Sequence, residues 1–291
     1  MKKIRKAVIP AAGMGTRVLP ATKVMPKEML PIVDKPAIQY IVEEAASAGI
    51  EDILIITNRG KGLIEDHFDR APELESALSA KPGREDILDE IVNVSKLANI
   101  FFIRQKEIRG LGHAIYCAKE FVGDEPFAVL YGDDVILGET PVCSQLMDAY
   151  EAYGKGVVGV KEVAEEMISQ YSSLKLSPLQ NNWFSCTDMI EKPSKGQEFS
   201  LYSILGRCIL PPEIFDILAD TPPGAGGEIQ LTDAMRSLAV RDSMTAVDFV
   251  GRRYDMGNKL GIMQASVEVA LAHPQIGAGF KEYLKALAET L

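Results

Sequence analysis

The N-terminal half of the chain alternates between two hydrophobic periods, and this alternation constrains the fold more than any other feature. Strand-like apolar runs are found at 5–9, 52–57, 100–104, 127–132 and 157–161. Helix-like periodicity fills the intervals, at 37–48, 61–69, 85–98, 112–120 and 143–152. This order predicts βαβ units, whose parallel strands need helices on both faces. We therefore expect an α/β protein with a Rossmann-like, mixed but mostly parallel central sheet flanked by helices.

The pattern changes after about residue 162. Short extended runs at 173–177, 184–191 and 204–210 precede helix-like segments at 212–219, 229–240, 258–272 and 277–289. No repeat, low-complexity tract or linker separates the two parts. We expect one domain over 1–291, in which 163–291 add strands to the sheet of 1–162 and end in helices.

Composition and charge narrow the class of protein further. The chain has 291 residues, of which 47% are hydrophobic, enough to bury the core of a large domain. Its formal charge of −10 argues against a general binder of nucleic acid or anionic membranes, because such binding needs a broad cationic surface. No apolar stretch is long enough to span a bilayer, and no signal-peptide pattern precedes the first strand. We expect a cytoplasmic protein without nucleic-acid or membrane partners.

Cysteine usage agrees with that compartment. The four cysteines are widely spaced, with no Cys-x-x-Cys pair and no histidine at metal-ligand spacing: Cys117, Cys143, Cys186 and Cys208. We interpret them as reduced thiols.

The stretch PAAGMGTRVLPATKVMPKEML, residues 10–30, follows the first strand-like run and is rich in Gly, Pro and basic residues. Gly13 and Gly15 let backbone N–H groups approach an anion without obstruction by a Cβ. The third glycine of the dinucleotide-binding turn is missing, however, and no Walker loop is present. The pattern therefore indicates phosphate binding by a different kind of loop.

Prolines at positions 20 and 26 of this stretch, and at position 31 directly after it, prevent a long helix from starting after the turn. We expect an extended loop that lies over the strand ends. Arg17 and Lys27 can bring positive charge to a polyphosphate from its side. We interpret the loop as a triphosphate clamp; the alternative is a surface loop with solvated cations.

FAVLYGDDVIL places Asp133 and Asp134 directly after an apolar strand. Carboxylates at the carboxyl end of a parallel strand lie where α/β sheets bind ligands, and they suit Mg²⁺ that bridges phosphate oxygens. The alternative is a turn in which an aspartate caps a helix.

MIEKPSKG ends a short strand with Glu191 and Lys192. A carboxylate can accept hydrogen bonds from sugar hydroxyls while the adjacent ammonium meets a phosphate, so one strand end can hold a sugar phosphate at both ends. A charged exit from the strand into a loop is the alternative.

RQKEIRGLGHAI places Gln105 at the end of a strand and Gly110 before a helix. Gln105 offers a donor and an acceptor, the pair needed to read the imide edge of uracil, and a glycine lets the ring lie against the backbone. We do not interpret His113 as catalytic, because no serine or cysteine nucleophile pattern accompanies it.

These motifs together resemble those of the sugar-1-phosphate nucleotidyltransferases. The version Pro-Lys-Glu-Met at 26–29 is similar to that of the bacterial UTP:glucose-1-phosphate uridylyltransferases, or UDP-glucose pyrophosphorylases. Further matches follow in order along nearly the whole chain: DKPAIQYIVEEA at 34–45, IEDHF at 64–68, RQKEIRGLGHAI at 104–115, GDD at 132–134, EKP at 191–193, GAGGEIQLTDA at 224–234 and YDMGNKLG at 254–261.

The resemblance implies a fold, a reaction and a set of site residues. The fold is that of the nucleotide-diphospho-sugar transferases, with a nucleotide-binding core in 1–162 and sugar-phosphate-binding strands and C-terminal helices in 163–291. The reaction is Mg²⁺-assisted in-line attack of glucose 1-phosphate on UTP, giving UDP-glucose and pyrophosphate. The implied residues are Arg17, Lys27 and Lys192 for catalysis; Ala11, Ala12, Gly13, Gly15, Thr16, Gln105 and Gly110 for the nucleotide; Glu191, Lys192 and Ser172 for the sugar phosphate; and Asp133 and Asp255 for the metal.

One departure from the family pattern leaves room for other functions. Ser172 stands after Tyr171, where the family usually has a glycine whose backbone approaches the sugar, so we expect its side chain near the glucose site. A weakly active regulatory paralogue is one alternative, and a thymidylyltransferase that shares the clamp and metal site is another. A nicotinamide-dependent dehydrogenase is disfavoured by the missing glycine and the prolines.

The C-terminal segment 280–287 is amphipathic. The resemblance implies a homodimer or homotetramer, and this segment is a candidate for its interface. It is equally a candidate for closing the core of its own chain.

Overall fold

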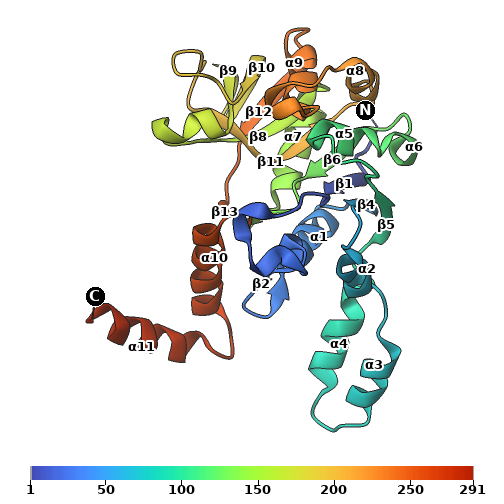
Figure 1. Ribbon diagram of the computed structural model, residues 1–291, viewed down its shortest axis with the longest axis vertical. Coiled ribbons are helices and arrows are strands. Elements are labelled where there is room, and N and C mark those ends of the chain that lie inside the picture. Colours follow the sequence, from blue (N-terminus) through green and yellow to red (C-terminus); the bar gives the residue numbers. More distant parts are fainter. Residues whose placement is uncertain (1, 291) are drawn as a thin grey trace.

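A nine-stranded mixed sheet organises the molecule (Figure 1). The structure is a computed structural model that describes residues 2–290, apart from the side chain of residue 225. In spatial order the strands are β5 (Asn99–Arg104), β4 (Asp52–Thr57), β1 (Lys6–Pro10), β6 (Phe127–Leu130), β11 (Tyr202–Leu210), β8 (Gly156–Glu162), β12 (Met244–Asp248), β10 (Trp183–Glu191) and β9 (Ser172–Pro178).

Strand direction divides this sheet into two parts. The pairings β4–β5, β1–β4 and β1–β6 are parallel, as is β8–β12, and their register places Val8 opposite Leu54 and Val129. The other four pairings, which involve β9, β10 and β11, are antiparallel. The predicted α/β fold with a mixed sheet is confirmed, but mostly parallel pairing holds only for the part built from the βαβ units.

Helices cover both faces of the sheet. They are α1 (Ala37–Ser47), α2 (Gly62–Phe68), α3 (Pro72–Ser79), α4 (Glu85–Val94), α5 (Leu111–Tyr116), α6 (Lys119–Val122), α7 (Val142–Tyr153), α8 (Ile214–Asp220), α9 (Leu231–Ala239), α10 (Lys259–Ala272) and α11 (Gly277–Ala288). Helices α1, α2 and α7 pack on one face, and α5, α6, α8 and α9 pack on the other. The predicted helical segments therefore all exist, although 112–120 is divided into α5 and α6.

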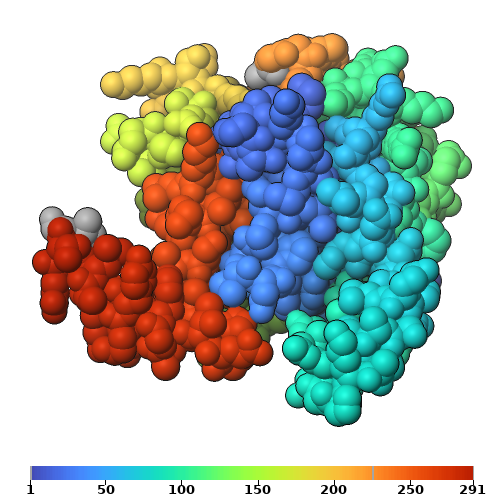
Figure 2. All heavy atoms as spheres, turned by 60° about the horizontal axis from the view of Figure 1, so that its bottom comes forward, coloured from blue at the N-terminus to red at the C-terminus, as the bar shows by residue number. Residues whose placement is uncertain are grey.

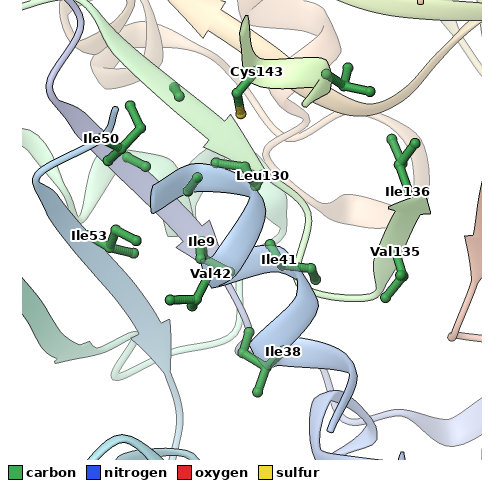
Figure 3. Packing of buried hydrophobic residues seen from close by; sticks show 14 of the residues in the cluster. Ile9, Ile38, Ile41, Val42, Ile50, Ile53, Leu130, Val135, Ile136 and Cys143 are labelled. Atoms are coloured by element: carbon green, nitrogen blue, oxygen red, sulfur yellow. The ribbon is translucent and has the colours of Figure 1, made fainter. Parts of the chain in front are cut away.

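Alternation along the central strands explains the two-sided core. In β1, Ile9 contributes to the cluster under α1 and Val8 to the cluster under α5, because successive side chains point to opposite faces. Figure 3 shows Ile38, Ile41 and Val42 of α1 directed at the sheet beside Ile9. These residues are fully buried, so each stabilises the fold by about 1.5–3 kcal/mol relative to an exposed side chain.

Several elements were not predicted. They are helix α3, strand β12 between β8 and β10, and two small antiparallel pairs, β2 (Pro31–Ile32) with β3 (Lys35–Pro36) and β7 (Asp134–Leu137) with β13 (Arg252–Asp255). The run predicted as a strand over 127–132 ends at Leu130, because Tyr131 to Asp133 form a turn before β7. Strands from 163–291 lie within the same sheet as those of 1–162, while separate binding roles for the two parts stay a prediction.

Two protrusions extend from the body of the molecule (Figure 2). One is the hairpin of α3 and α4, and the other is formed by α10 and α11. Helix α11 contributes no side chain to either core cluster, and Tyr283 on it is 60% exposed. The C-terminal segment therefore does not close the core of its own chain. Within residues 2–290, no helix combines the length and apolarity needed to cross a bilayer.

Candidate functional site

A cavity of about 230 Å³ lies at the carboxyl ends of β1, β5 and β6. Ala12 and Gly13 follow β1, Gln105 follows β5, and Asp133 lies in the turn after β6. A larger cavity of about 410 Å³ adjoins it and shares Gly13, Lys27 and Gln105 with it. The position agrees with the rule that open α/β sheets bind ligands beyond the carboxyl ends of their strands.

The loop after β1 is wound rather than extended. It contains three short 3₁₀ turns, at Thr16–Val18, Ala21–Lys23 and Lys27–Met29, and no α-helix. The prolines excluded a helix as predicted, but the backbone tightens into turns, and Gly15 adopts a left-handed conformation with φ 67°. A hydrogen bond from Thr22 Oγ1 to the Gly15 carbonyl, 2.7 Å long, fixes this bend.

Ala11 is buried at the base of the loop and does not line the cavity. It is 1% exposed, its N–H donates to the Ile56 carbonyl at 2.8 Å, and its own carbonyl accepts from Lys61 Nζ at 2.5 Å. The Ala12 carbonyl accepts from Asn58 Nδ2. Both backbone groups of Ala11 are thus used inside the fold, and its place alongside the base stays a prediction. Ala12 and Gly13 do line the cavity.

Lys61 belongs to a buried ion pair beneath the loop. Its Nζ lies 2.8 Å from Oε2 of Glu28, which is fully buried. Burial raises the pKa of Glu28 and lowers that of Lys61, and the attraction between the two charges limits both shifts. The pair joins the loop at Glu28 to the segment between β4 and α2.

Two cation–carboxylate pairs meet at the edge of the cavity. Lys27 Nζ lies 2.5 Å from Asp133 Oδ2, and Arg17 Nη1 lies 3.7 Å from Asp255 Oδ2. Burial works against the charge on Asp133, but Lys27 and Arg17 outweigh it and hold the pKa of that carboxyl below its usual value. For Lys27, burial lowers the pKa and Asp133 with Glu28 raises it, with a net increase. Both side chains are therefore charged at neutral pH.

Gly257 shows that the two carboxylates converge. A Cβ placed on Gly257 would lie 2.9 Å from Asp133 Oδ2, 2.8 Å from Asp255 Oδ1 and 2.5 Å from Arg17 Nη2. The turn that carries Asp255 is held by hydrogen bonds from Met256 N–H to the Asp133 carbonyl and from Gly257 N–H to Asp255 Oδ1. No cluster of three or more His, Cys, Asp or Glu side chains suited to a metal exists among residues 2–290. The donor set is thus two carboxylates, which fits a hard cation completed by phosphate and water oxygens.

Asp134 has a different partner. Its Oδ1 accepts from Arg253 Nε at 2.7 Å and lies 2.5 Å from Arg253 Nη2. Burial, with Asp133 and Asp255 nearby, raises the pKa of Asp134 to about 6 although Arg253 opposes the shift. Gly206, with φ 77°, leaves the space that this carboxylate occupies, since a Cβ there would lie 2.7 Å from its oxygen. Asp134 therefore belongs to a structural ion pair behind the cavity.

Gln105 and Gly110 face each other in the cavity wall. Gln105 is 4% exposed, and its Nε2 donates to the Gly110 carbonyl at 3.1 Å and to His113 Nδ1 at 2.9 Å. Gly110 has φ 101°, and a Cβ there would lie 2.7 Å from Glu228 and 2.8 Å from the Ile229 carbonyl. Only glycine fits at this position, because the segment that contains Glu228 packs directly against it.

The residues predicted for the sugar phosphate lie together at the end of β10, outside both cavities. Glu191 Oε2 accepts from Thr232 Oγ1 at 2.7 Å, and burial raises the pKa of Glu191. Lys192 is exposed, has φ 47°, and its N–H donates to the Tyr171 carbonyl at 2.8 Å. The ring of Tyr171 lies 5.7 Å from the Arg253 guanidinium, and Arg253 pairs with Asp134. Lys192 is therefore connected to the region of Asp133 through Tyr171 and Arg253 rather than by direct contact.

The side chain of Ser172 is buried within the sheet. It is 4% exposed, and its Oγ lies 3.2 Å from Ser203 Oγ and accepts from Ile204 N–H at 3.1 Å. These partners belong to β11, so the hydroxyl bonds inside the sheet. Its side chain is therefore engaged within the sheet, while its place near the glucose site stays a prediction.

The structure brings Arg17, Lys27, Asp133 and Asp255 together, and it places Ala12, Gly13, Gln105 and Gly110 around one cavity. Gly15 and the exposed Thr16 lie on the same loop but do not line either cavity. Sequence reasoning missed the supporting residues Asn58, Lys61, His113 and Arg253. Asn58 and Lys61 follow the carboxyl end of β4, and the strand-end rule that identified Asp133 could have found them.

A model of the family described as "Nucleotidyl transferase" matches residues 6–271. The chain belongs to the nucleotidyl transferase family. A "UTP--glucose-1-phosphate uridylyltransferase" of Staphylococcus epidermidis is 52% identical over 287 residues, which cover 99% of this chain and 99% of that relative. Family membership therefore extends over the full length and includes every motif described above.

Solved structures of the family match the fold closely. "UDP-glucose pyrophosphorylase complexed with UDP-glucose" is 42% identical and has a TM-score of 0.85 over 92% of this chain and 98% of that one. "UTP-bound UGPase from acinetobacter baumannii" is 38% identical, with a TM-score of 0.89 over 97% of this chain and 99% of that one. Members with this fold thus bind UTP in one case and UDP-glucose in the other.

Proposed function

We propose that this protein transfers the uridylyl group of UTP to glucose 1-phosphate, giving UDP-glucose and pyrophosphate. The observation that carries the proposal is the convergence of Arg17, Lys27, Asp133 and Asp255 at the edge of a cavity lined by Gly13 and Gln105. Full-length identity to the uridylyltransferases supports the choice of nucleotide and sugar.

In this function the cavity between Gly13, Gln105 and Gly110 receives the uridine part of UTP. Ala12 and Gly13 present backbone groups at the end of β1, where a glycine lets a ring or phosphate approach closely. The triphosphate extends toward Lys27 and Arg17. Glucose 1-phosphate enters from the side of β10, with Glu191 on its hydroxyls and Lys192 on its phosphate.

Asp133 and Asp255 are the side chains that would hold Mg²⁺. Their oxygens suit this hard cation, which keeps several water or phosphate ligands and is usually bound through one or two carboxylates. When bound, the cation supplies charge neutralisation for phosphate oxygens. Lys27 and Arg17 pair with these carboxylates and would meet the phosphates beside them.

The reaction needs orientation and charge cancellation rather than a base. The phosphate of glucose 1-phosphate is already anionic at neutral pH. One of its oxygens attacks the α-phosphorus of UTP, and the bond from that phosphorus to the bridging oxygen breaks, so that pyrophosphate leaves with the electron pair. Lys192, Arg17 and Lys27 offset the repulsion between the two polyanions and the charge that develops on the leaving group.

The test is a matrix of nucleoside triphosphates against sugar 1-phosphates, read by pyrophosphate release in the presence of Mg²⁺. The proposal expects UTP with glucose 1-phosphate to give the highest kcat/KM. A preference for dTTP would identify a thymidylyltransferase instead. Binding of UDP-glucose without any pyrophosphate would identify a regulatory paralogue.

The cytoplasm is the compartment that we propose for this reaction. All four cysteines are free thiols, three of them buried, as expected of a protein kept in a reducing environment. Fractionation of cells that produce the protein would test this, and recovery outside the cytoplasm would contradict it.

A further inference from the structure

The orientation of the Gln105 amide is fixed by a group that can only accept. The Gly110 carbonyl lies 3.1 Å from one terminal atom of Gln105, and a carbonyl oxygen has no proton to donate. That terminal atom must therefore be the amide nitrogen, Nε2. The main chain of Gln105 is fixed as well, because its N–H donates to the Thr57 carbonyl at 2.8 Å.

The tautomer of His113 follows from that orientation. Nδ1 of His113 lies 2.9 Å from Gln105 Nε2, which has only protons to offer. Nδ1 must therefore be unprotonated and accept, so the ring proton is on Nε2. Partial burial and the nearby Arg109 lower the pKa of His113, and Glu107 opposes them only in part, so the ring is neutral at neutral pH.

These two hydrogen bonds use both amide protons of Gln105. The remaining polar atom of the side chain, Oε1, has no donor among residues 2–290 and belongs to a residue that lines both cavities. The wall thus offers an acceptor to a bound base. The N–H groups of Ala12 and Gly13 have no backbone partner within the described chain, so donors lie across the same cavity.

We propose that His113 is a positioning residue for base specificity: by accepting from Gln105 Nε2 it keeps Oε1 of Gln105 turned to the cavity, where it selects pyrimidines with a proton on N3 over cytosine. Uracil and thymine carry a donor N3–H between two carbonyl oxygens, whereas N3 of cytosine is an acceptor. A base held by its ribose and phosphates presents N3 at one place, so cytosine would set two acceptors against each other there. The inference rests on the proposed function only in placing a pyrimidine nucleotide in this cavity.

Without His113 the amide keeps a single anchor, the Gly110 carbonyl, and turns more readily to present Nε2 to the base. His113→Leu removes the acceptor while keeping an apolar side chain on α5. His113→Asn retains an acceptor, because Asn Oδ1 occupies nearly the position of His Nδ1. The three proteins are compared by kcat/KM for UTP and for CTP with glucose 1-phosphate, and by calorimetric binding of UMP and CMP.

The expected result is a UTP-to-CTP selectivity about tenfold lower in His113→Leu, the worth of one hydrogen bond. The loss falls on the KM for UTP, the KM for glucose 1-phosphate is unchanged, and His113→Asn restores the wild-type ratio. Unchanged selectivity in His113→Leu, or an equal loss in His113→Asn, overturns the inference. If His113→Leu does not fold, His113→Ala replaces it in the same comparison. If no pyrophosphate is released by the wild type, the proposed function fails, and the ratio of UMP to CMP affinity still decides the role of His113.

Discussion

Lys27 Nζ lies 2.5 Å from Oδ2 of Asp133, the carboxylate that we propose as a magnesium ligand. The ammonium therefore pairs with the same oxygen that would bind the divalent cation. Its positive charge offsets the negative charge of the carboxylate. A cation held by Asp133 would compete with this ammonium, which would then be left to pair with the phosphates. This exchange predicts that Lys27 opposes cation binding in the free protein and assists the reaction in the loaded one.

Lys27→Met should therefore separate these two effects. In the absence of nucleotide, Mn²⁺ should bind the variant more tightly, because the competing ammonium is gone. Turnover should fall by roughly two to three decades, the usual cost of one electrostatic catalytic contact. Mn²⁺ titration by electron paramagnetic resonance and steady-state kinetics check the two expectations. Lys23→Met is the control, since Lys23 is exposed on the same loop and makes no ion pair in the described part of the chain. Equal Mn²⁺ affinity in both variants would contradict the exchange.

Asp255→Asn tests the second carboxylate. The amide keeps the shape of the side chain but removes a charge beside Asp133 and Arg17. The Mg²⁺ concentration for half-maximal activity should rise by about ten- to a hundredfold, at least the effect of losing a supporting group in a metal site. Chelation should abolish activity in both proteins, and added Mg²⁺ should restore it. An unchanged Mg²⁺ dependence would leave Asp133 as the only protein ligand.

The sequence predicted those helices and strands whose own residues repeat the hydrophobic period of a helix or a strand. Strand β4 was predicted with both its bounds, because five of its six residues are buried. Strand β13 has the sequence RRYD, in which only Tyr254 is buried, and helix α3 has only Glu75 buried. Such segments carry no period of 2 or 3.6, so pairing with a distant partner, rather than local sequence, determines them.

The same limit explains which site residues were predicted. Asp133 and Gln105 come just after a strand and Glu191 ends one, so a local rule finds them. Lys61 acts on the carbonyl of Ala11, 50 positions away, and no property of either segment alone indicates that contact. Ser172 was predicted to face the sugar because only its position along the chain was known, whereas its hydroxyl bonds to Ser203 and Ile204 of another strand.

Ser172→Gly should leave the choice of sugar unchanged and lower stability. It removes the acceptor of the Ile204 N–H and introduces glycine into a strand, at a cost of about 1–3 kcal/mol for the unpaired group and about 0.5–1 kcal/mol for the backbone. Thermal melting and kinetics on a panel of sugar 1-phosphates measure both. Ser185→Gly in β10 is the control for the backbone cost alone, because no hydrogen bond of its side chain is found in the described structure. A changed sugar preference would show that Ser172 reaches the site after all.

Two substitutions of Lys192 should separate its charge from its backbone. Lys192→Ala and Lys192→Gly both remove the ammonium, so each should lose roughly two to three decades of kcat. Only glycine accepts φ 47° without strain, and Lys192→Gly should be more stable than Lys192→Ala by about 1 kcal/mol. Kinetics and urea unfolding give the two quantities. Lys195→Ala, at an exposed lysine of the same turn, should behave as wild type. Near-normal turnover in both Lys192 variants would remove this residue from the mechanism.

Lys61→Met should produce a stability loss that depends on pH. It leaves the fully buried Glu28 without its partner 2.8 Å away, which costs about 3–5 kcal/mol when the carboxylate is charged. Burial already raises the pKa of Glu28, with Lys61 and Lys27 opposing, so removal of Lys61 raises it further. The folded state then binds a proton more readily than the unfolded chain, so its stability is retained at low pH and lost as the pH rises through the raised pKa.

Urea unfolding of Lys61→Met at about pH 5 and about pH 8 should therefore show a smaller loss of stability at the lower pH. Adding Glu28→Gln should recover much of the loss at the higher pH and flatten the dependence, because the buried charge is then absent. A deficit equal at both pH values would mean that Glu28 stays charged without Lys61 and that another group compensates it.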